Sequence, residues 1–311
     1  MKIAFRIDMG HRVGMGHFIR MSALAEALED LGGICAFFTS SDEPINYSGF
    51  DIIIVDTYQV TSKYIAALNH PGRLVVCFDD DALYTYSCDM LINTNFYAKK
   101  LAIRTGEKKP KMLLGSKYAL LRREFRDASP ISVNQFASRI FVCFGGSDMR
   151  NFTPFAIKSL VGICGAHLVV VLGEQTLCDE EVFQLKSLDV EILKAPKSMV
   201  DIMRRCDVAV IASGSMVYEI ASIGLPAIVV TQADNQMLIS QYLEREELMK
   251  WAGDWNKVQA YYLGEQVEAL LNNPKRRAHE SKRLIEAVDK DGAHNAAKVI
   301  MEVSNEIIGK S

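Results

Sequence analysis

A glycine-rich stretch near the amino terminus ends in a histidine. Asp8 closes a short apolar run, Gly14 and Gly16 follow, and His17 opens a segment with helical spacing. Glycines let the backbone approach a bound group closely, and the first amides of a helix favour an anion or a polarised oxygen. An imidazole, with an unperturbed pKa of about 6.5, suits proton abstraction at neutral pH. We therefore expect His17 to be a catalytic base whose ring Asp8 orients; a buried structural histidine is the alternative.

The spacing of these glycines differs from two common nucleotide-binding motifs. The stretch lacks the Lys-Ser/Thr pair of a P-loop, and Gly10, Gly14 and Gly16 do not have the GxGxxG spacing of a dinucleotide site. The sequence also contains no HExxH or GxSxG pattern, which disfavours zinc hydrolysis and a serine nucleophile. We expect neither a nicotinamide nor any other cofactor.

Two loops in the second half of the chain are suited to polar ligand groups. Gly145, Gly146 and Ser147 follow a β-type run and can present backbone amides to a phosphate, although a plain tight turn explains the glycines equally well. Asn235 and Gln236 follow a later strand, and their carboxamides can read the edge of a sugar or a nucleobase.

A third loop joins a strand to a helix. Ser213, Gly214 and Ser215 place two hydroxyls beside the first free amides of that helix, which suits a diphosphate; Ser215 as a simple helix cap is the alternative. Glu219 is four residues after Ser215, on the same helix face, where it can accept both hydroxyls of a ribose. A solvated glutamate is the alternative for Glu219.

Carboxylates follow two strands in the first half of the chain. The three successive carboxylates at 79–81 do not point the same way, so they cannot all ligate one ion, and we expect no metal site. We assign one of Asp79 or Asp80 to a ligand cleft and select Asp79 as substrate-binding. Asp56 and Tyr58, after the preceding strand, receive the same role, with a plain turn as the alternative.

Short runs rich in Val, Ile and Phe, each followed by a turn and a segment with helical spacing, predict parallel strands joined by crossover helices. Strands are predicted at 2–7, 35–39, 52–55, 74–78, 90–92, 139–144, 167–172, 190–193, 208–212 and 227–230. Helices are predicted at 17–31, 60–68, 153–163, 180–187, 199–205, 215–223, 235–246 and 264–272, with one last long helix from about residue 275.

The length of 311 residues exceeds that of a typical single domain and suits two. A polar interval at 122–130 predicts the linker, so we expect domains at 1–130 and 131–311. The fold class is then α/β: two Rossmann-like domains whose parallel sheets face one another across a cleft. Ligands of such sheets bind at the carboxyl ends of the strands.

Composition limits the partners. The chain is 49% hydrophobic and 23% charged, with a net charge of -3 and no basic stripe, so nucleic acid is not an expected partner. The first apolar run meets Arg6 at once, no run reaches the length of a membrane span, and the seven Cys form no CxxC pair. We expect a cytoplasmic protein, and the sequence leaves its oligomeric state open, with a monomer among the options.

Short motifs along nearly the whole chain match one family in order. They are Arg6-x-Asp8, Gly14-x-Gly16-His17-x-x-Arg20, Phe78-Asp79-Asp80, Cys88-Asp89 with Asn93, Leu120-Leu121-Arg122-x-Glu124-Phe125, Gly145-Gly146-Ser147-Asp148, Gly214-Ser215 with Glu219, Gly224-Leu225-Pro226 and Ala233-Asp234-Asn235-Gln236. The chain resembles the PseG-like UDP-sugar hydrolases and their spore-coat polysaccharide relatives in the GT-B superfamily.

The resemblance implies a fold, a reaction and a substrate. It implies a GT-B architecture with UDP held mainly by the second domain and a final helix that returns toward the first. The residue matching His17 is the general base that activates water for attack on the anomeric carbon, with inversion and release of UDP and without a metal. Arg6 and Arg20 match positions assigned to substrate binding. The implied substrate is UDP-2,4-diacetamido-2,4,6-trideoxy-β-L-altropyranose, a precursor in pseudaminic or related nonulosonic acid biosynthesis.

One departure and three rival functions accompany the resemblance. Relatives carry an Asp-Gly-x-Gly-Ala-x-Arg segment near the carboxyl terminus, whereas residues 289–295 read Asp-Lys-Asp-Gly-Ala-His-Asn, which puts the exact sugar in doubt. A GT-B glycosyltransferase that uses a UDP-sugar donor is the main alternative. A nucleotide-sugar binding or scaffold protein and a hydrolysing 2-epimerase are the others.

Overall fold

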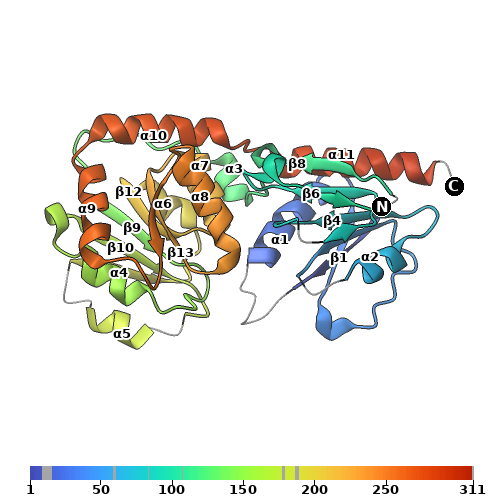
Figure 1. Cartoon of the computed structure of the whole chain (residues 1–311), viewed down its shortest axis with the longest axis horizontal. Helices are drawn as coiled ribbons and strands as arrows, with labels where there is room; N and C mark the ends of the chain where they lie inside the picture. Colours follow the sequence, from blue (N-terminus) through green and yellow to red (C-terminus); the bar gives the residue numbers. More distant parts are fainter. Residues whose placement is uncertain are drawn as a thin grey trace. The chain divides into compact units, whose positions relative to one another are not determined.

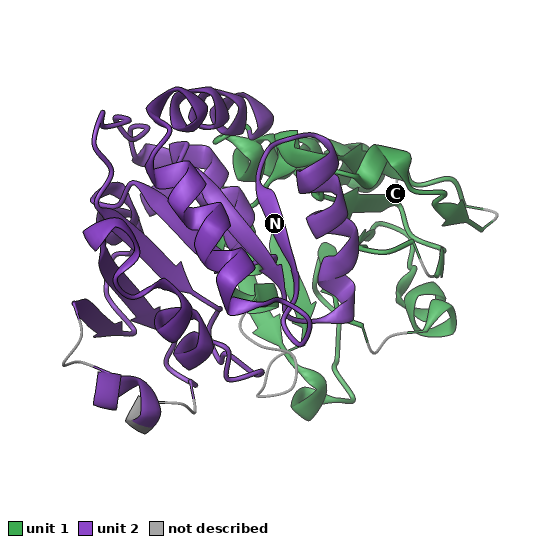
Figure 2. Cartoon of the chain, turned by 60° about the vertical axis from the view of Figure 1, so that its left-hand side comes forward, with its two compact units in different colours: residues 1–123, 289–311 green, residues 124–288 purple. Residues whose placement is uncertain are grey.

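The chain divides into two compact units, which are coloured separately in Figure 2. The computed structural model describes residues 1–8, 16–58, 61–82, 84–106, 108–176, 179–185 and 189–309. Unit 1 comprises residues 1–123 and 289–311, and unit 2 comprises residues 124–288. The chain therefore enters unit 2 before the predicted boundary at residue 130, and its last helix belongs to unit 1 rather than to a domain ending at residue 311.

Unit 1 is built on a parallel sheet in the order β2-β1-β3-β4-β6-β8. Figure 1 labels β1, β4, β6 and β8 of this sheet. The strands are β1 (Lys2–Ile7), β2 (Ile34–Phe38), β3 (Ile52–Asp56), β4 (Leu74–Phe78), β6 (Met90–Asn93) and β8 (Lys111–Leu114). Two short strands, β5 (Thr85–Tyr86) and β7 (Arg104–Thr105), pair separately. The helices are α1 (Gly16–Glu29), α2 (Ser62–Leu68) and α11 (Gly292–Ile308), with 3-10 turns η1 (Ser40–Asp42), η2 (Ala98–Lys100) and η3 (Ser116–Tyr118).

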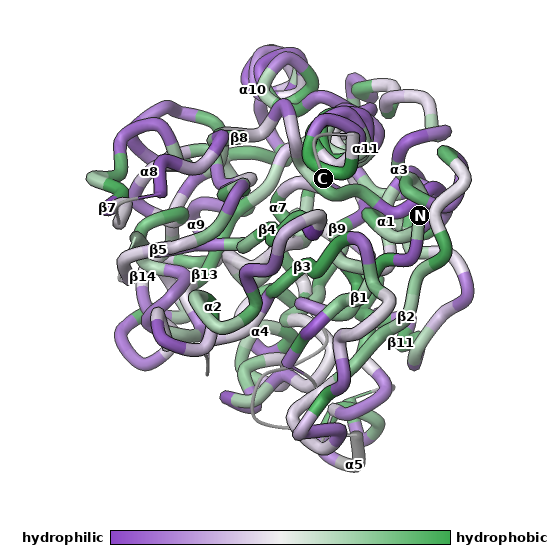
Figure 3. The backbone as a smooth tube through the Cα atoms, turned by 90° about the vertical axis from the view of Figure 1, so that its right-hand side faces the viewer, coloured by the Kyte–Doolittle hydropathy of each residue, from purple (hydrophilic) through white to green (hydrophobic). Residues whose placement is uncertain are grey.

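Each face of the unit 1 sheet has its own core. Alternate residues of β1, β3 and β4, including Phe5, Ile54 and Phe78, pack under α1 and α11, and we call this side the α1 face. The intervening residues, including Ala4 and Val55, pack with α2 and form the α2 face. Because both faces are covered, β3 and β4 are mostly apolar, as the green β3 in Figure 3 shows.

Unit 2 repeats this plan with a parallel sheet in the order β11-β10-β9-β12-β13-β14. The strands are β9 (Arg139–Cys143), β10 (His167–Leu172), β11 (Val190–Lys194), β12 (Val208–Ala212), β13 (Ala227–Thr231) and β14 (Lys250–Asp254). The helices are α4 (Thr153–Leu160), α5 (Asp179–Gln184), α6 (Met199–Arg204), α7 (Met216–Ile223), α8 (Met237–Arg245), α9 (Ala260–Leu271) and α10 (Pro274–Ala287), with 3-10 turns η4 (Ile163–Gly165) and η6 (Asp234–Gln236). Helix α3 (Arg123–Asp127) starts at the last residue of the first segment of unit 1.

Every strand predicted from the sequence is present, with ends that differ by at most one residue. The prediction missed the edge strands β8 and β14, because both are short and carry Lys, and β14 also contains Gly253. The prediction of one last long helix is wrong: α10 ends at Ala287, Val288 is extended, and α11 starts at Gly292. None of the described helices is long and apolar enough to cross a membrane.

Strand order places the ligand-binding edge of each unit. In unit 1 the order reverses between β1 and β3, and in unit 2 it reverses between β9 and β12. Loops at the carboxyl ends of strands beside such a reversal form the usual ligand crevice of an open α/β sheet. Among the described candidates, Asp56 ends β3, Gly145 follows β9 and Ser213 follows β12, all strands beside a reversal.

The close packing of Gly292, at the start of α11, against Ala119 allows a test of the unit 1 fold. A Cβ atom on Gly292 would lie 2.4 Å from the Ala119 carbonyl oxygen and 2.5 Å from its nitrogen, both backbone atoms that cannot rotate away. We expect Gly292→Ala to lower the free energy of unfolding by about 2 kcal/mol in urea denaturation. Gly106→Ala is the control, because its Cβ would meet nothing closer than 3.8 Å, and we expect a change within about 0.5 kcal/mol. Equal effects of the two substitutions would contradict the close approach of α11 to η3.

Candidate active site and nucleotide-binding loops

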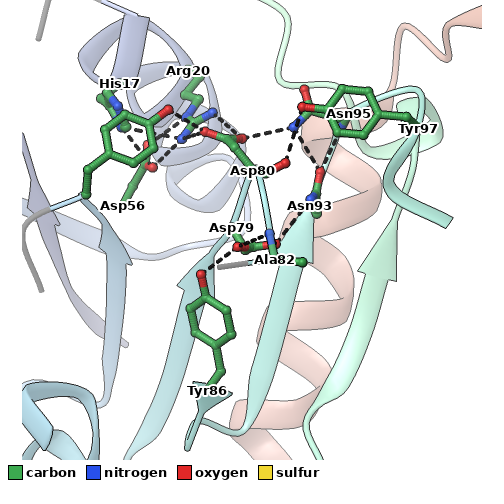
Figure 4. A network of polar contacts seen from close by, with 11 residues as sticks. His17, Arg20, Asp56, Asp79, Asp80, Ala82, Tyr86, Asn93, Asn95 and Tyr97 are labelled. Carbon is green, nitrogen blue, oxygen red and sulfur yellow. Dashed lines mark hydrogen bonds and ion pairs between the residues drawn. The ribbon is translucent and has the colours of Figure 1, made fainter. Parts of the chain in front are cut away.

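A polar network lies at the carboxyl ends of β3, β4 and β6 in unit 1 (Figure 4). It is centred on His17, the second residue of α1. The His17 Nδ1 atom lies 2.9 Å from Oδ1 of Asp56, and both residues are buried. The Tyr58 ring packs edge-on against the imidazole, with 4.7 Å between ring centroids. Asp56 fixes the ring through Nδ1, which also lies 3.4 Å from Nη2 of Arg20. The described residues supply no hydrogen-bond partner for Nε2.

The guanidinium of Arg20, one helical turn after His17, lies between two carboxylates. Its Nε donates to Asp56 Oδ2 at 2.7 Å, and its Nη2 donates to Asp56 Oδ1. Nη1 and Nη2 each donate to an oxygen of Asp80 at 3.0 Å. Paired hydrogen bonds of this fork geometry are among the strongest in proteins.

The acidic and basic side chains of this network stay ionised although they are shielded from solvent. Burial alone raises the pKa of Asp56, but Arg20 and His17 more than offset it and hold that pKa well below its usual range. The pKa of Asp80 is also lowered, because Arg20 outweighs the effect of burial. For Arg20, burial lowers the pKa, but Asp56 and Asp80 raise it well above its ordinary value. Asp56 therefore stays a carboxylate across the neutral range.

The prediction that Asp8 orients the His17 ring is wrong at the level of contacts. The Asp8 carboxylate accepts hydrogen bonds from the Thr57 hydroxyl and, at 2.9 Å, from the Tyr58 amide. The physical reason is strand alternation: Ile7 faces α1, so Asp8 points to the opposite side of the sheet. Asp8 instead holds the loop that carries Tyr58.

Arg6 shares the face of Asp8 and has structural partners. Its Nε donates to Glu43 at 3.0 Å, and its Nη1 donates to the Ile7 carbonyl at 2.7 Å. Burial lowers the pKa of Arg6, but the hydrogen bond to Glu43 and nearby charges raise it above its ordinary value. The structure does not bring Arg6 to His17, and its predicted contact with substrate has no support from this geometry.

Asp79 and Asp80 point in different directions. Asp79 accepts hydrogen bonds from the Tyr86 hydroxyl at 2.6 Å, the Ala82 amide and the Asn93 side chain, so it braces the sheet rather than the His17 network. Figure 4 shows Asp80 directed to Arg20 and Asp79 directed away from it. The sequence prediction selected Asp79, but Asp80 is the residue that joins the His17 network. Phe78 faces α1, so the alternation of side chains places Asp80 on the α1 face and Asp79 on the opposite face.

Most of the other residues predicted for this site lie near His17, and one lies outside the described residues. Arg20, Asp56 and Tyr58 come together around His17. Gly16 starts α1, whereas Gly14 lies outside the described residues. Sequence reasoning did not single out Asn95, which donates to Asp80 at 3.0 Å. Among the described residues, no three His, Cys, Asp or Glu are placed to hold a metal ion.

In unit 2, the loop after β9 is shaped by close backbone packing. Gly145 has φ +89°, a conformation that favours glycine, and a Cβ on Gly173 would lie 2.1 Å from the Gly146 carbonyl oxygen. Asp148 accepts hydrogen bonds from the Phe152 and Thr153 amides at 3.0 and 2.9 Å, so it occupies the start of α4. Any phosphate contact of this loop therefore falls to Gly145, Gly146 and Ser147.

The loop after β12 leaves polar groups without partners. Ser213 is fully buried, and its hydroxyl has no hydrogen-bond partner among the described residues. Ser215 is the N-cap of α7 by position but makes no side-chain cap hydrogen bond, so the simple-cap alternative does not hold. Glu219 is buried, which excludes the solvated alternative.

The loop after β13 contains a residue that the sequence prediction did not select. Gln232 is 8% exposed, and neither its Oε1 nor its Nε2 has a partner among the described residues. Its amide donates to Gln236 Oε1 at 2.9 Å, and its carbonyl accepts from Arg150 Nε at 3.1 Å. Asn235 is exposed on η6. Burial without a partner is the feature that marks Gln232, and sequence does not display it.

Comparisons with known proteins match these elements to a family. The family model described as the glycosyltransferase family 28 C-terminal domain matches residues 139–298. Uncharacterized protein MJ1062 of Methanocaldococcus jannaschii is 26% identical over 76% of this chain and 57% of its own length. The UDP-2,4-diacetamido-2,4,6-trideoxy-beta-L-altropyranose hydrolase of Campylobacter jejuni is 29% identical over 49% of this chain and 63% of its own. The chain thus spans less than two thirds of these two relatives.

A third relative and a solved structure complete the comparison. The spore coat polysaccharide biosynthesis protein SpsG of Bacillus subtilis is 22% identical over 76% of this chain and 79% of its own. MurG of Acinetobacter baumannii, at 12% identity, matches 97% of this chain and all of its own with a TM-score of 0.64. The resemblance to the PseG-like and spore-coat group and the α/β fold class predicted from the sequence are confirmed. The chain belongs to the family of the glycosyltransferase family 28 C-terminal domain and has the GT-B fold.

Proposed function

We propose that the chain is a UDP-sugar hydrolase in which His17 activates water for attack on the anomeric carbon. The observation that carries this proposal is the buried Asp56–His17 pair, which leaves the imidazole Nε2 without a partner among the described residues. A carboxylate on Nδ1 keeps the proton on that nitrogen and the lone pair on Nε2. The ring is then set up to accept a proton.

The proposed reaction needs few parts. Nε2 of His17 removes a proton from water as the water oxygen forms a bond to the anomeric carbon. The bond from that carbon to the diphosphate oxygen breaks, its electron pair leaves with UDP, and the sugar is released with inverted configuration. Asp56, 2.9 Å from Nδ1, stabilises the imidazolium that forms. Neither a metal nor a covalent intermediate enters this scheme.

Unit 2 is the proposed holder of UDP. The Ser213 hydroxyl and both side-chain polar atoms of Gln232 are buried and have no partner in the described part of the chain. They lie at the carboxyl ends of the neighbouring strands β12 and β13. Such groups are costly unless a ligand or water satisfies them. We infer that they contact the nucleotide together with Gly214, Ser215 and Glu219 at the start of α7. Gly145, Gly146 and Ser147 complete the proposed site, with Asn235 and Gln236 toward the sugar.

The comparisons favour two related activities. The Campylobacter jejuni relative is named a hydrolase of a UDP-linked diacetamido-trideoxy sugar, and that sugar class is the substrate we propose. The Bacillus subtilis name agrees with a place in surface polysaccharide biosynthesis. The family description favours a second candidate, a glycosyltransferase with a UDP-sugar donor, in which an acceptor hydroxyl replaces water at His17.

One experiment separates the two activities. The protein is incubated with UDP-linked diacetamido-trideoxy sugars in EDTA, with and without alcohol and sugar acceptors, and UDP and free sugar are followed by NMR. Stoichiometric UDP and free sugar without acceptor support the hydrolase. Turnover that appears only when an acceptor is added would replace it with the transferase.

His17 itself is tested by His17→Gln, which keeps a hydrogen-bonding side chain but cannot accept the proton. We expect kcat for UDP release to fall by about 10³-fold, because general-base catalysis contributes about 10² to 10⁴. UDP affinity should stay within about twofold, because unit 2 is the proposed holder. The control is His279→Gln, an exposed residue of α10, which should leave both parameters unchanged. A fully active His17→Gln protein would remove the base assignment.

Gln232 is tested by Gln232→Met, a substitution of similar volume. Because the Gln232 side-chain carboxamide has no partner among the described residues, its loss should not lower stability. The Kd for UDP, measured by calorimetry, should rise about tenfold, the effect of about one hydrogen bond. Gln241→Met, on the exposed side of α8, is the matched control. Unchanged UDP affinity in Gln232→Met would contradict the role proposed for this loop.

A further inference from the structure

Asp80 is connected to His17 only through other side chains. Its two oxygens accept hydrogen bonds from Arg20 at 3.0 Å, and Arg20 in turn holds Asp56, which holds the His17 ring. One guanidinium is shared between the carboxylates of the buried Asp56 and the partly buried Asp80, and we call this arrangement the Arg20 bridge. Both carboxylates lie on the α1 face, at the ends of the neighbouring strands β3 and β4.

Asp80 is also fixed from its other side. The Tyr58 hydroxyl donates to Asp80 Oδ2 at 2.8 Å, and the Asn95 side chain donates to Oδ1 at 3.0 Å. The Tyr97 hydroxyl donates to the Asp80 carbonyl at 3.2 Å. Because the Tyr58 ring returns to His17, five side chains form a closed circuit: His17, Asp56, Arg20, Asp80 and Tyr58. Asp80 is therefore rigidly placed for an indirect role.

We propose that Asp80 is a positioning residue that sets the basicity of His17 through the Arg20 bridge. This inference rests on the proposed function of His17 as the base. Because Arg20 donates hydrogen bonds to both Asp56 and Asp80, its positive charge offsets only part of the negative charge of Asp56. The remaining negative charge of Asp56 stabilises the protonated imidazole. Without Asp80, Arg20 neutralises Asp56 fully, and the ring becomes a weaker base.

The sign of each effect follows from counting charges in the circuit. With a neutral imidazole, the two carboxylates and the guanidinium sum to −1, and proton uptake by His17 brings the sum to zero. Asp80→Asn removes a negative charge and disfavours proton uptake. Arg20→Gln leaves two uncompensated carboxylates and favours it. The two substitutions must therefore act in opposite directions.

Other charged groups near the circuit supply a control. Asp79 is occupied by Tyr86, Ala82 and Asn93. Asp81 has no hydrogen-bond partner among the described residues, and burial, with the charges of Asp80 and Asp79, raises its pKa to about 6. Above pH 6, where Asp81 is mostly ionised, Asp81→Asn thus removes a negative charge one residue from Asp80 without removing a hydrogen bond of Arg20. Comparison of Asp81→Asn with Asp80→Asn therefore distinguishes an effect that acts through the Arg20 bridge from a general effect of nearby charge.

The test has two readouts. The first is the pH dependence of kcat/KM for UDP release, whose acid limb reports the base of the free enzyme. The second is ring ¹⁵N NMR of the resting protein, with the His17 signals identified by their absence in His17→Gln. We expect Asp80→Asn to move both midpoints to lower pH by about half a unit, about a threefold change in proton affinity, and Arg20→Gln to move both to higher pH. Asp81→Asn should move them by less than half as much as Asp80→Asn.

A double variant guards against misfolding, because Arg20→Gln leaves two carboxylates unpaired. Arg20→Gln with Asp80→Asn restores the net charge of −1, so both midpoints should return toward those of the native protein. Shifts of the same sign in both single variants, or equal shifts in Asp80→Asn and Asp81→Asn, would overturn the proposal. The NMR readout stands without turnover, so an inactive protein with opposite shifts would sink the hydrolase and leave the Arg20 bridge intact.

Discussion

The guanidinium of Arg20 lies between the carboxylates of the buried Asp56 and the partly buried Asp80, and the arrangement of unit 1 around its candidate site depends on that placement. Two ionised carboxylates at the ends of adjacent strands repel one another and lose hydration, and only a cation held by both offsets these costs. Arg20 projects from α1, so α1 must dock with its first turn over β3 and β4. The same docking delivers His17, one turn earlier, to Asp56. One ionic constraint thus fixes both the helix and the base.

This constraint also explains why a base is plausible at a buried position. An isolated buried imidazole resists protonation, because burial disfavours the charged form. Asp56, kept ionised by Arg20, offers a compensating charge 2.9 Å from Nδ1. The proposed nucleotide site in unit 2 differs, because the Ser213 hydroxyl and the Gln232 carboxamide are uncharged and have no partner among the described residues. In the proposed reaction, unit 1 supplies the charged groups for proton transfer and unit 2 supplies hydrogen bonds to the nucleotide.

The alternation of side chains along the strands determines which of the predicted residues lie at the His17 network. The sequence predicted the strands and identified His17, Arg20, Asp56 and Tyr58, because each follows a recognisable strand or helix signal. It failed for Asp8 and Asp79, which are also carboxylates after strands. Asp56 continues the side of Ile54 and Asp80 that of Phe78, on the α1 face, whereas Asp8 and Asp79 continue the opposite side. That signal is present in the sequence once the helix on each face is known. Burial of the Gln232 side chain without a partner among the described residues arises from tertiary packing and has no comparable signal. The break between α10 and α11 ends at Asp291-Gly292, a turn dipeptide that the prediction passed over.

The central claim is that water attacks the anomeric carbon rather than phosphorus. Hydrolysis in H₂¹⁸O tests it most directly, with the products analysed by mass spectrometry after a single turnover. The account predicts one ¹⁸O atom in the anomeric hydroxyl of the free sugar and none in UDP. Label in the β-phosphate of UDP would contradict attack at carbon, and the role given to His17 would fall with it.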